Sequence, residues 1–218
     1  MIEDRSDDEN SVLPPLRDDD TSYELKNQTL TKSQIRDLKN VLASNLKNHA
    51  TLTKLTLEGI GLDYKGAGII ADALVSNKKL QYLSLANNPN IGYKGVQHFG
   101  ISLRLNKTLK TLNLSETGLD RDCVESLSLG LKENTALTML NLNSNKELNY
   151  NDHETNVFIN RINIRLKQSI GIQERAKKNE QKQQNTTNTS KRVAVKEESE
   201  PDSDSSVSDV KDGNWCCC

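Results

Sequence analysis

The side chains with the most distinctive chemistry are the three thiols of Cys216, Cys217 and Cys218, at the C-terminal end of the sequence. A cysteine can act as a nucleophile, bind a metal or carry a lipid. Three adjacent thiols cannot surround a metal tetrahedrally without further ligands. A disulfide framework is not expected in the cytosol, where we place the chain. Two interpretations remain open for this segment, lipidation and a bare flexible end.

The usual prenylation signal does not explain the terminal thiols, because it needs a cysteine at the fourth position from the end, where Trp215 stands. The segment resembles instead the terminal Cys-Cys of small GTPases that receive two prenyl groups, and the cysteine clusters that receive palmitate. That resemblance implies peripheral membrane contact through lipid. The acidic residues that precede the thiols oppose binding to an anionic membrane surface.

The other groups that could support catalysis show no recognisable arrangement. His49, His98 and His153 have neither metal-binding nor acid–base spacing. The glycine-rich segment 59–68 lacks the patterns that bind phosphate groups. Cys123 has no base next to it in the sequence and takes a place where a small buried side chain is needed. We therefore expect no catalytic residue, no metal and no cofactor, and we expect that the protein is not an enzyme.

Charge divides the chain into parts. Residues 1–22 contain eight acidic residues and only two arginines, which predicts a disordered acidic tail. Residues 171–195 form a basic, helix-compatible linker, for which a solvated role is favoured over contact with nucleic acid or anionic lipid, so no nucleic-acid partner is expected. Residues 196–218 form a second disordered acidic tail. Serines flanked by acids in that tail resemble substrates of acid-directed kinases, and the phosphorylation candidates are Ser199, Ser203, Ser205 and Ser206.

Residues 23–170 contain an internal repeat. Four copies of the motif L-x-x-L-x-L begin at Leu52, Leu80, Leu109 and Leu137. The segments between them share an apolar column with i, i+4, i+8 spacing, such as Gly66, Ile70 and Leu74, followed three residues later by an asparagine. Alternating leucines have the period of a strand, and the i, i+4, i+8 column has the period of a helix. Each unit therefore predicts one short strand and one helix.

These units resemble the ribonuclease-inhibitor type of leucine-rich repeat, whose units of about 28 residues occur in intracellular proteins. The consensus asparagine or cysteine after the strand is present as Asn88 and Asn145, whereas Ile60 and Thr117 replace it in other units. The resemblance implies an α/β leucine-rich-repeat solenoid, with a curved parallel sheet inside and helices outside. The acidic composition of the two ends adds disordered N- and C-terminal tails to this solenoid.

In such a solenoid the leucines point into the core and the intervening strand positions face outward on the concave side. Tyr82 and Met139 are the candidate anchors, because aromatic side chains and methionine are enriched at the centres of interfaces. The alternative is that they are ordinary solvated strand residues. The predicted partner-binding residues are Lys54, Thr56, Glu58, Tyr82, Ser84, Asn87, Thr111, Asn113, Glu116, Met139, Asn141 and Asn143.

The sequence lacks a signal-peptide pattern and an apolar run long enough to span a membrane, which indicates a cytoplasmic protein, on the cytosolic face of a membrane if the lipid is attached. We expect a monomeric, non-catalytic adaptor that binds a protein partner of unknown identity. The alternative is a regulatory subunit that modulates an enzyme, such as a GTPase or nuclease, by covering its surface.

Overall fold

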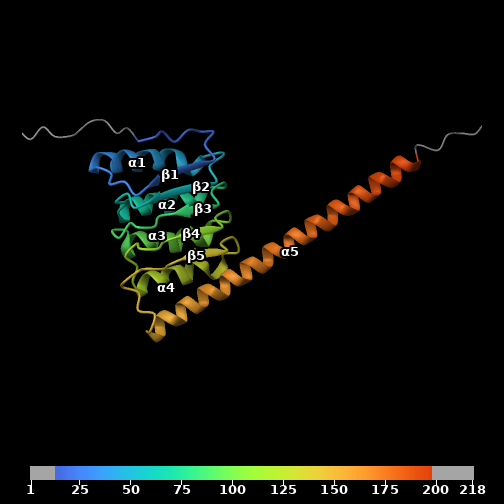
Figure 1. Cartoon of the computed structure of the whole chain (residues 1–218). Helices are drawn as coiled ribbons and strands as arrows, with labels where there is room; N and C mark the ends of the chain where they lie inside the picture. Colours follow the sequence, from blue (N-terminus) through green and yellow to red (C-terminus); the bar gives the residue numbers. More distant parts are fainter. Residues whose placement is uncertain (1–12, 198–218) are drawn as a thin grey trace, which may run out of the picture. The chain divides into compact units, whose positions relative to one another are not determined.

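The computed structural model describes residues 13–197, and it describes side chains as far as Gln183. Strands and helices alternate along the chain, and the five strands form one parallel sheet in the order β1-β2-β3-β4-β5 (Figure 1). The elements are β1 Ser22–Lys26, α1 Lys32–Asn45, η1 Leu46–Asn48, β2 Lys54–Glu58, α2 Tyr64–Ser76, β3 Tyr82–Ser84, α3 Gly92–Leu105, β4 Thr111–Asn113, α4 Arg121–Gly130, η2 Leu131–Glu133, β5 Met139–Asn141 and α5 His153–Glu197.

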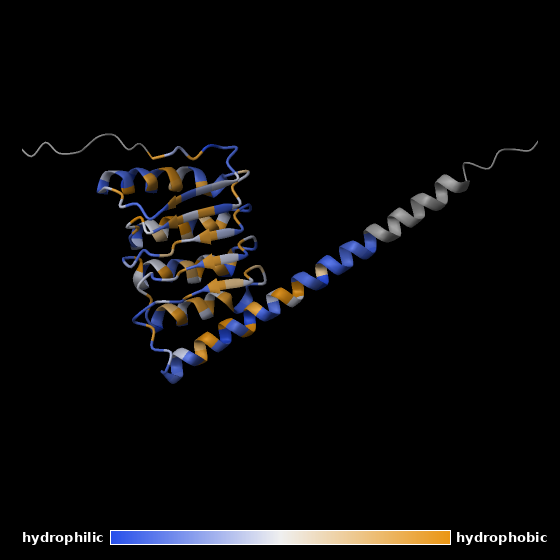
Figure 2. Ribbon diagram, viewed as in Figure 1, coloured by the Kyte–Doolittle hydropathy of each residue, from blue (hydrophilic) through white to orange (hydrophobic). Residues whose placement is uncertain are grey.

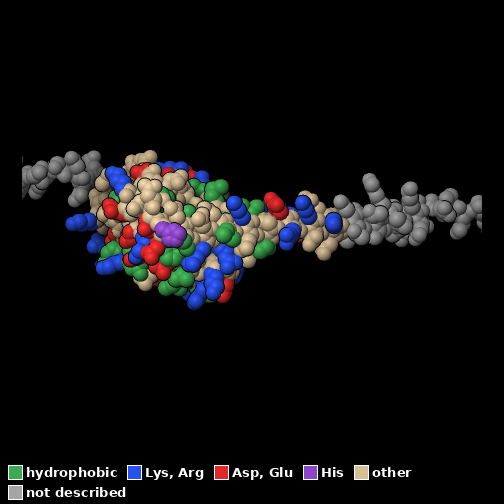
Figure 3. Space-filling view, turned by 90° about the horizontal axis from the view of Figure 1, so that it is seen from below, with side chains coloured by type: hydrophobic (Ala, Val, Ile, Leu, Met, Phe, Trp, Pro, Cys, Tyr) green, Lys and Arg blue, Asp and Glu red, His purple; other side chains and the backbone are tan. Residues whose placement is uncertain are grey.

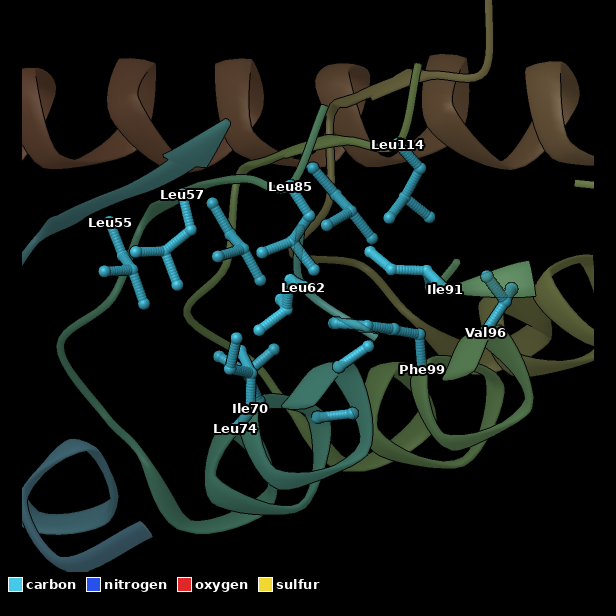
Figure 4. Close-up of a cluster of buried hydrophobic side chains, with 14 of the residues drawn as sticks. Leu55, Leu57, Leu62, Ile70, Leu74, Leu85, Ile91, Val96, Phe99 and Leu114 are labelled. Carbon is cyan, nitrogen blue, oxygen red and sulfur yellow. The ribbon is translucent and has the colours of Figure 1, made fainter. Parts of the chain in front are cut away.

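The core lies between the sheet and the helices, as the leucine spacing predicts. Leu55, Leu83 and Leu112 pair in register on adjacent strands, and all three are fully buried. Figure 4 shows leucines from the strand side facing Ile70 of α2 and Phe99 of α3. Each fully buried aliphatic side chain contributes about 1.5–3 kcal/mol relative to exposure. The repeated column of leucines is therefore the main source of cohesion between units.

Two buried asparagines, Asn88 and Asn145, each join their repeat to the one before it. The Asn88 side chain donates to the carbonyls of Leu57 and Leu85, and its oxygen accepts from the backbone N–H groups of Ile60 and Leu62. Asn145 serves the loop after β4 in the same way. The loops without their own consensus asparagine are thus held by the asparagine of the following repeat.

A second asparagine column closes the C-terminal ends of the helices. Asn106 donates from Nδ2 to the carbonyl of Leu74 at 2.7 Å, and its Oδ1 accepts from the N–H of Leu109 at 2.8 Å. Asn77 and Asn134 make the equivalent bonds. Because buried carbonyl and N–H groups must be paired, this column explains the asparagine found at the same place in each repeat.

Helix starts and helix spacing follow from other side chains. The Asp63, Asp120 and Asp152 carboxylates accept from backbone N–H groups in the first turns of α2, α4 and α5. The helices α3 and α4 approach closely at two glycines, since a Cβ atom on Gly130 would overlap the carbonyl oxygen of Gly100. Only glycine at this position permits such close packing.

The two ends of the stack are covered by different segments. Leu16, which precedes the predicted start of the repeats at residue 23, is buried, and Pro14 accepts a hydrogen bond from the Tyr23 hydroxyl at 2.8 Å. At the other end Ile162 of α5 is buried, and the Ser169 hydroxyl donates to the carbonyl of Asn134. Both ends of the apolar core are thereby shielded from water.

Contacts divide the chain into two units, with the boundary after Gln173. The first unit contains the sheet, helices α1 to α4 and the start of α5. In the second unit α5 continues as far as Glu197, and its coloured part is mainly hydrophilic (Figure 2). Among residues 13–197, no helix is both long and apolar enough to cross a membrane.

Candidate protein-binding surface

The outward strand positions of β1 to β5 form one polar sheet face, opposite the helices, which we call the concave face. Lys54, Tyr82, Thr111 and Met139 are in register on four consecutive strands. Met139 is 59% exposed, and the other three are half-buried. The structure therefore brings both predicted anchors, Tyr82 and Met139, into one row across the sheet.

Not every predicted contact residue is accessible. Thr56 and Ser84, which are register neighbours in the middle of the face, are fully buried. Longer side chains surround them: the Ser84 hydroxyl donates to Glu58 at 2.5 Å, and Lys54 pairs with Glu24 on the neighbouring strand. Strands only about 4.8 Å apart allow long side chains to cover short ones. The expectation that Thr56 and Ser84 are open to a partner is therefore corrected.

The N-terminal half of the concave face neutralises its own charges. Glu24 pairs with both Lys54 and Lys26, and the Lys54 ammonium also lies 5.6 Å from the centre of the Tyr82 ring. Hydrogen bonding from Lys54 lowers the pKa of Glu24, and the same bond raises the pKa of Lys54. These side chains already satisfy one another, so the net charge that they offer to a partner is small.

The C-terminal half instead offers hydrogen-bond donors. Asn113 uses its Oδ1 to accept from the N–H of Ser115 at 3.1 Å, and Asn141 accepts from Asn143 at 3.0 Å. Within the described part of the chain, the Nδ2 groups of Asn113 and Asn141 have no hydrogen-bond acceptor. The two asparagines are register partners and stand beside the exposed Met139. This half combines free amide donors with an apolar side chain.

Two further predicted contact residues form part of a structural column. Asn87 and Glu116 adopt positive φ angles of 61° and 55°, as do the equivalent Asn27, Gly59 and Ser144 in the other repeats. Each lies one to three residues after the end of a strand, where the chain turns toward the next helix. Side chains other than glycine and asparagine adopt this conformation at a cost of about 1–2 kcal/mol. The sequence does not reveal the column, because its residue types differ between repeats.

Reactive groups elsewhere are engaged in structure. Cys123 is buried, and burial is the main cause that raises the pKa of its thiol to about 12. The His49 ring accepts from the N–H of Leu52 and contacts the carbonyl of Arg17 at 2.9 Å, so it ties the N-terminal segment to the repeats. Residues 13–183, whose side chains the structure describes, contain no cluster of His, Cys, Asp or Glu that could hold a metal ion.

Several predicted modification sites lie outside the described residues. They are the lipidation candidates Cys216, Cys217 and Cys218, and the phosphorylation candidates Ser199, Ser203, Ser205 and Ser206.

Known proteins share the repeat region. No family model matches the chain. It is 36% identical over 128 residues to human NACHT, LRR and PYD domains-containing protein 5, and the aligned region covers 57% of this chain and 11% of that protein. It is 39% identical over 95 residues to human NACHT, LRR and PYD domains-containing protein 14, with 43% of this chain and 9% of that protein covered. The chain thus spans about a tenth of the length of these relatives.

The solved structure described as Leiomodin-1 Actin-Binding Site 2 superposes with a TM-score of 0.59 at 20% identity, covering 75% of this chain and 88% of that structure. This match confirms the predicted α/β solenoid. Domains built from such repeats typically serve as protein-interaction modules through the extended surface of the stack. The repeats described here form a leucine-rich-repeat domain, similar in sequence to segments of NACHT, LRR and PYD domains-containing proteins.

Proposed function

We propose that this chain is a non-catalytic adaptor that binds a protein partner on the concave face of its repeats. The observation that carries the proposal is the C-terminal half of that face, where Met139 is 59% exposed beside the free amide donors of Asn113 and Asn141. A partner that covers the exposed Met139 side chain and accepts from the two amide donors would gain both apolar burial and hydrogen bonds.

The chemistry of this half indicates what the partner supplies. The two Nδ2 groups need acceptors, which carbonyl or carboxylate oxygens provide. Met139 adapts to irregular apolar shapes, and Tyr82 adds an aromatic surface two strands away. An acceptor-rich segment with at least one apolar side chain fits this row. The N-terminal half, with its paired charges, would lie at the rim of such an interface.

The test compares partner capture by the wild-type chain and by Tyr82→Ala/Met139→Ala, read by mass spectrometry. Loss of two anchor side chains should weaken the affinity for a specific partner by tenfold or more, since truncation of a hot-spot residue to alanine costs about 2 kcal/mol or more of binding free energy. The matched control is Tyr93→Ala/Ile172→Ala, which removes one exposed tyrosine and one exposed aliphatic side chain from helices. Equal capture by all three proteins would show that the concave face is not the binding site.

Attachment to a membrane through lipid on Cys216, Cys217 and Cys218 is a separate part of this proposal, as is a cytoplasmic location. Fractionation of cells that express the wild-type chain or a variant with serine at all three positions tests it. If the wild-type chain carries lipid, it should be found in the membrane fraction and the variant in the soluble fraction. The reason is that two lipid chains anchor a protein stably, whereas a protein without lipid has no such anchor. An unchanged distribution would reject the lipid anchor and leave the adaptor role standing.

A further inference from the structure

A groove separates α4 from the first part of α5, on the side of the repeats away from the sheet face. Its volume is about 380 Å³, and its lining residues are Ser128, Leu129, Lys132, Arg161, Ile164, Arg165 and Gln168. All of them lie in the first unit of the chain. Helices α3 and α4 pack closely through Gly100 and Gly130, whereas α5 contacts α4 far less. The groove exists because α5 does not continue the helix spacing of the repeats.

Two large aliphatic side chains in this groove are open to solvent. Leu129 of α4 is 62% exposed and Ile164 of α5 is 55% exposed. Ile101, which occupies the place of Leu129 in the preceding repeat, is 57% exposed on α3. Covering such side chains releases about 25 cal/mol for each Å² of apolar surface removed from water. The groove and its margin therefore favour an apolar occupant.

The polar part of the lining has one sign of charge. Lys132, Arg161 and Arg165 contribute three cations, and no acidic residue lines this groove. In the described part of the chain none of the three forms an ion pair with a carboxylate; Arg165 donates to Gln168, and Arg161 lies over the Phe158 ring. Figure 3 shows hydrophobic side chains next to clustered Lys and Arg side chains on the face seen from the α5 end of the repeats.

We propose that this groove is a second docking site, which binds an acidic segment of a partner protein that carries apolar side chains. Leu129 and Ile164 cover the apolar side chains of that segment, while Lys132, Arg161 and Arg165 pair with its carboxylates. The assignment rests on charge complementarity, since a basic segment would bring a fourth cation into the groove and a neutral one would leave three cations without partners. The site is independent of the concave face.

A synthetic peptide provides the probe. It is a fluorescein-labelled peptide of about twelve residues, mainly glutamate, with leucines at i, i+3 and i+4 so that they share one helix face. Two control peptides replace the glutamates by lysine or the leucines by serine. Fluorescence anisotropy with the full chain should detect the acidic peptide and neither control, and binding should weaken as salt is raised, because salt screens exposed charges.

Protein variants locate the binding. Lys132→Glu/Arg165→Glu should weaken binding of the peptide by tenfold or more, because electrostatic contacts are lost. Leu129→Ser should weaken binding by about fivefold, because an apolar contact is lost. The matched control is Lys177→Glu/Lys178→Glu, which makes the same charge change on exposed α5 residues outside the groove and should alter binding less than twofold. Tyr82→Ala/Met139→Ala should bind the peptide as the wild type does.

Four results would overturn the proposal. They are absence of peptide binding to the wild-type chain, equal loss in the groove and control variants, concentration-dependent self-association that Lys132→Glu/Arg165→Glu abolishes, and peptide binding only after the acids of residues 198–212 are replaced by serine. The third would assign the groove to a second copy, and the fourth to the chain's own acidic segment. Circular dichroism melts identify any variant that fails to fold, and the peptide and salt comparisons need no variant at all.

Discussion

At the scale of single residues, the Thr56 hydroxyl stands out in the middle of the concave face. Thr56 is fully buried, and its Oγ1 is the one buried side-chain oxygen or nitrogen without a hydrogen-bond partner among the described residues. A buried unsatisfied hydroxyl costs about 1–3 kcal/mol, and valine has the same shape and an equal preference for strands. Thr56→Val should therefore raise the free energy of unfolding by about 1 kcal/mol.

Urea denaturation of the full chain measures this change. Thr111→Val is the matched control, because Thr111 is a half-buried threonine on the same face, two strands away from Thr56. It should change the free energy of unfolding by less than about 0.5 kcal/mol, the usual range for surface substitutions. Destabilisation by Thr56→Val would mean that the Thr56 hydroxyl has a hydrogen-bond partner in solution, and an equal gain in both variants would mean that the gain does not come from an unsatisfied hydroxyl.

The sequence located the candidate surface better than it ranked the residues on it. The period of two places Tyr82 and Met139 on the outward face because alternation is a property of each strand alone. Burial of Thr56 depends on the lengths of side chains on the adjacent strands, so no single repeat contains that information. The left-handed conformation of Glu116 is similarly set by the turn that follows the strand, and glutamate gives no sign of it.

At the scale of elements, the start of α2 depends on a carboxylate with two roles. Asp63 accepts from the Gly66 N–H at 2.9 Å and pairs with Lys39 of α1 at 2.7 Å. Partial burial tends to raise its pKa, but the hydrogen bonds from Lys39 and Gly66 prevail, and the pKa is lowered from 3.8. Because the folded pKa lies below the ordinary value, this interaction stabilises the fold above pH 3.8 and is lost as the pH falls through the lowered pKa.

Asp63→Asn isolates that contribution, since asparagine also caps helices but carries no charge for Lys39. The variant should lose less than about 1 kcal/mol at pH 7, because the pair is partly exposed to solvent. The difference from the wild type should shrink toward zero as the pH falls below 3.8. Urea denaturation midpoints at pH 7 and in acid measure this difference. The control is Asp37→Asn, which removes the charge of an exposed aspartate on α1. A loss that persists undiminished in acid would rule out the charge pair as its cause.

Strands and helices inside the repeats were predictable because the same leucine and asparagine columns recur in each. The ends were predictable only in part, since they lack the full repeat. Leu16 packs onto the core although Arg17 and three aspartates follow it, and a single apolar residue beside so many charges gives no sign that it is buried. The sequence indicates a helix-compatible segment after Ile172 but not where α5 ends, because few apolar residues follow Ile172 and helix-favouring Lys, Gln and Glu carry no periodic signal there.

At the scale of the whole molecule, the stability of the repeats should fall toward the end that α5 covers. In a linear repeat array each unit is stabilised by its neighbours, so the last unit depends on its cap. That cap rests on the buried Ile162 and on hydrogen bonds from Ser169 and Gln173 to the backbone of residues 134–136. Replacing Ile162 by alanine should cost about 2–4 kcal/mol of local stability, as for other buried isoleucines.

Hydrogen exchange of the full chain should show this loss as a gradient. In Ile162→Ala the amides of β5 should exchange faster by tenfold or more, those of β4 less so, and those of β2 little, because local opening exposes the last repeat first. Ile164→Ala is the control, since Ile164 lies two residues away on α5 but is 55% exposed, and its exchange should match the wild type. An equal increase from β2 to β5 would show instead that the repeats open as one cooperative unit, with α5 stabilising all of them alike.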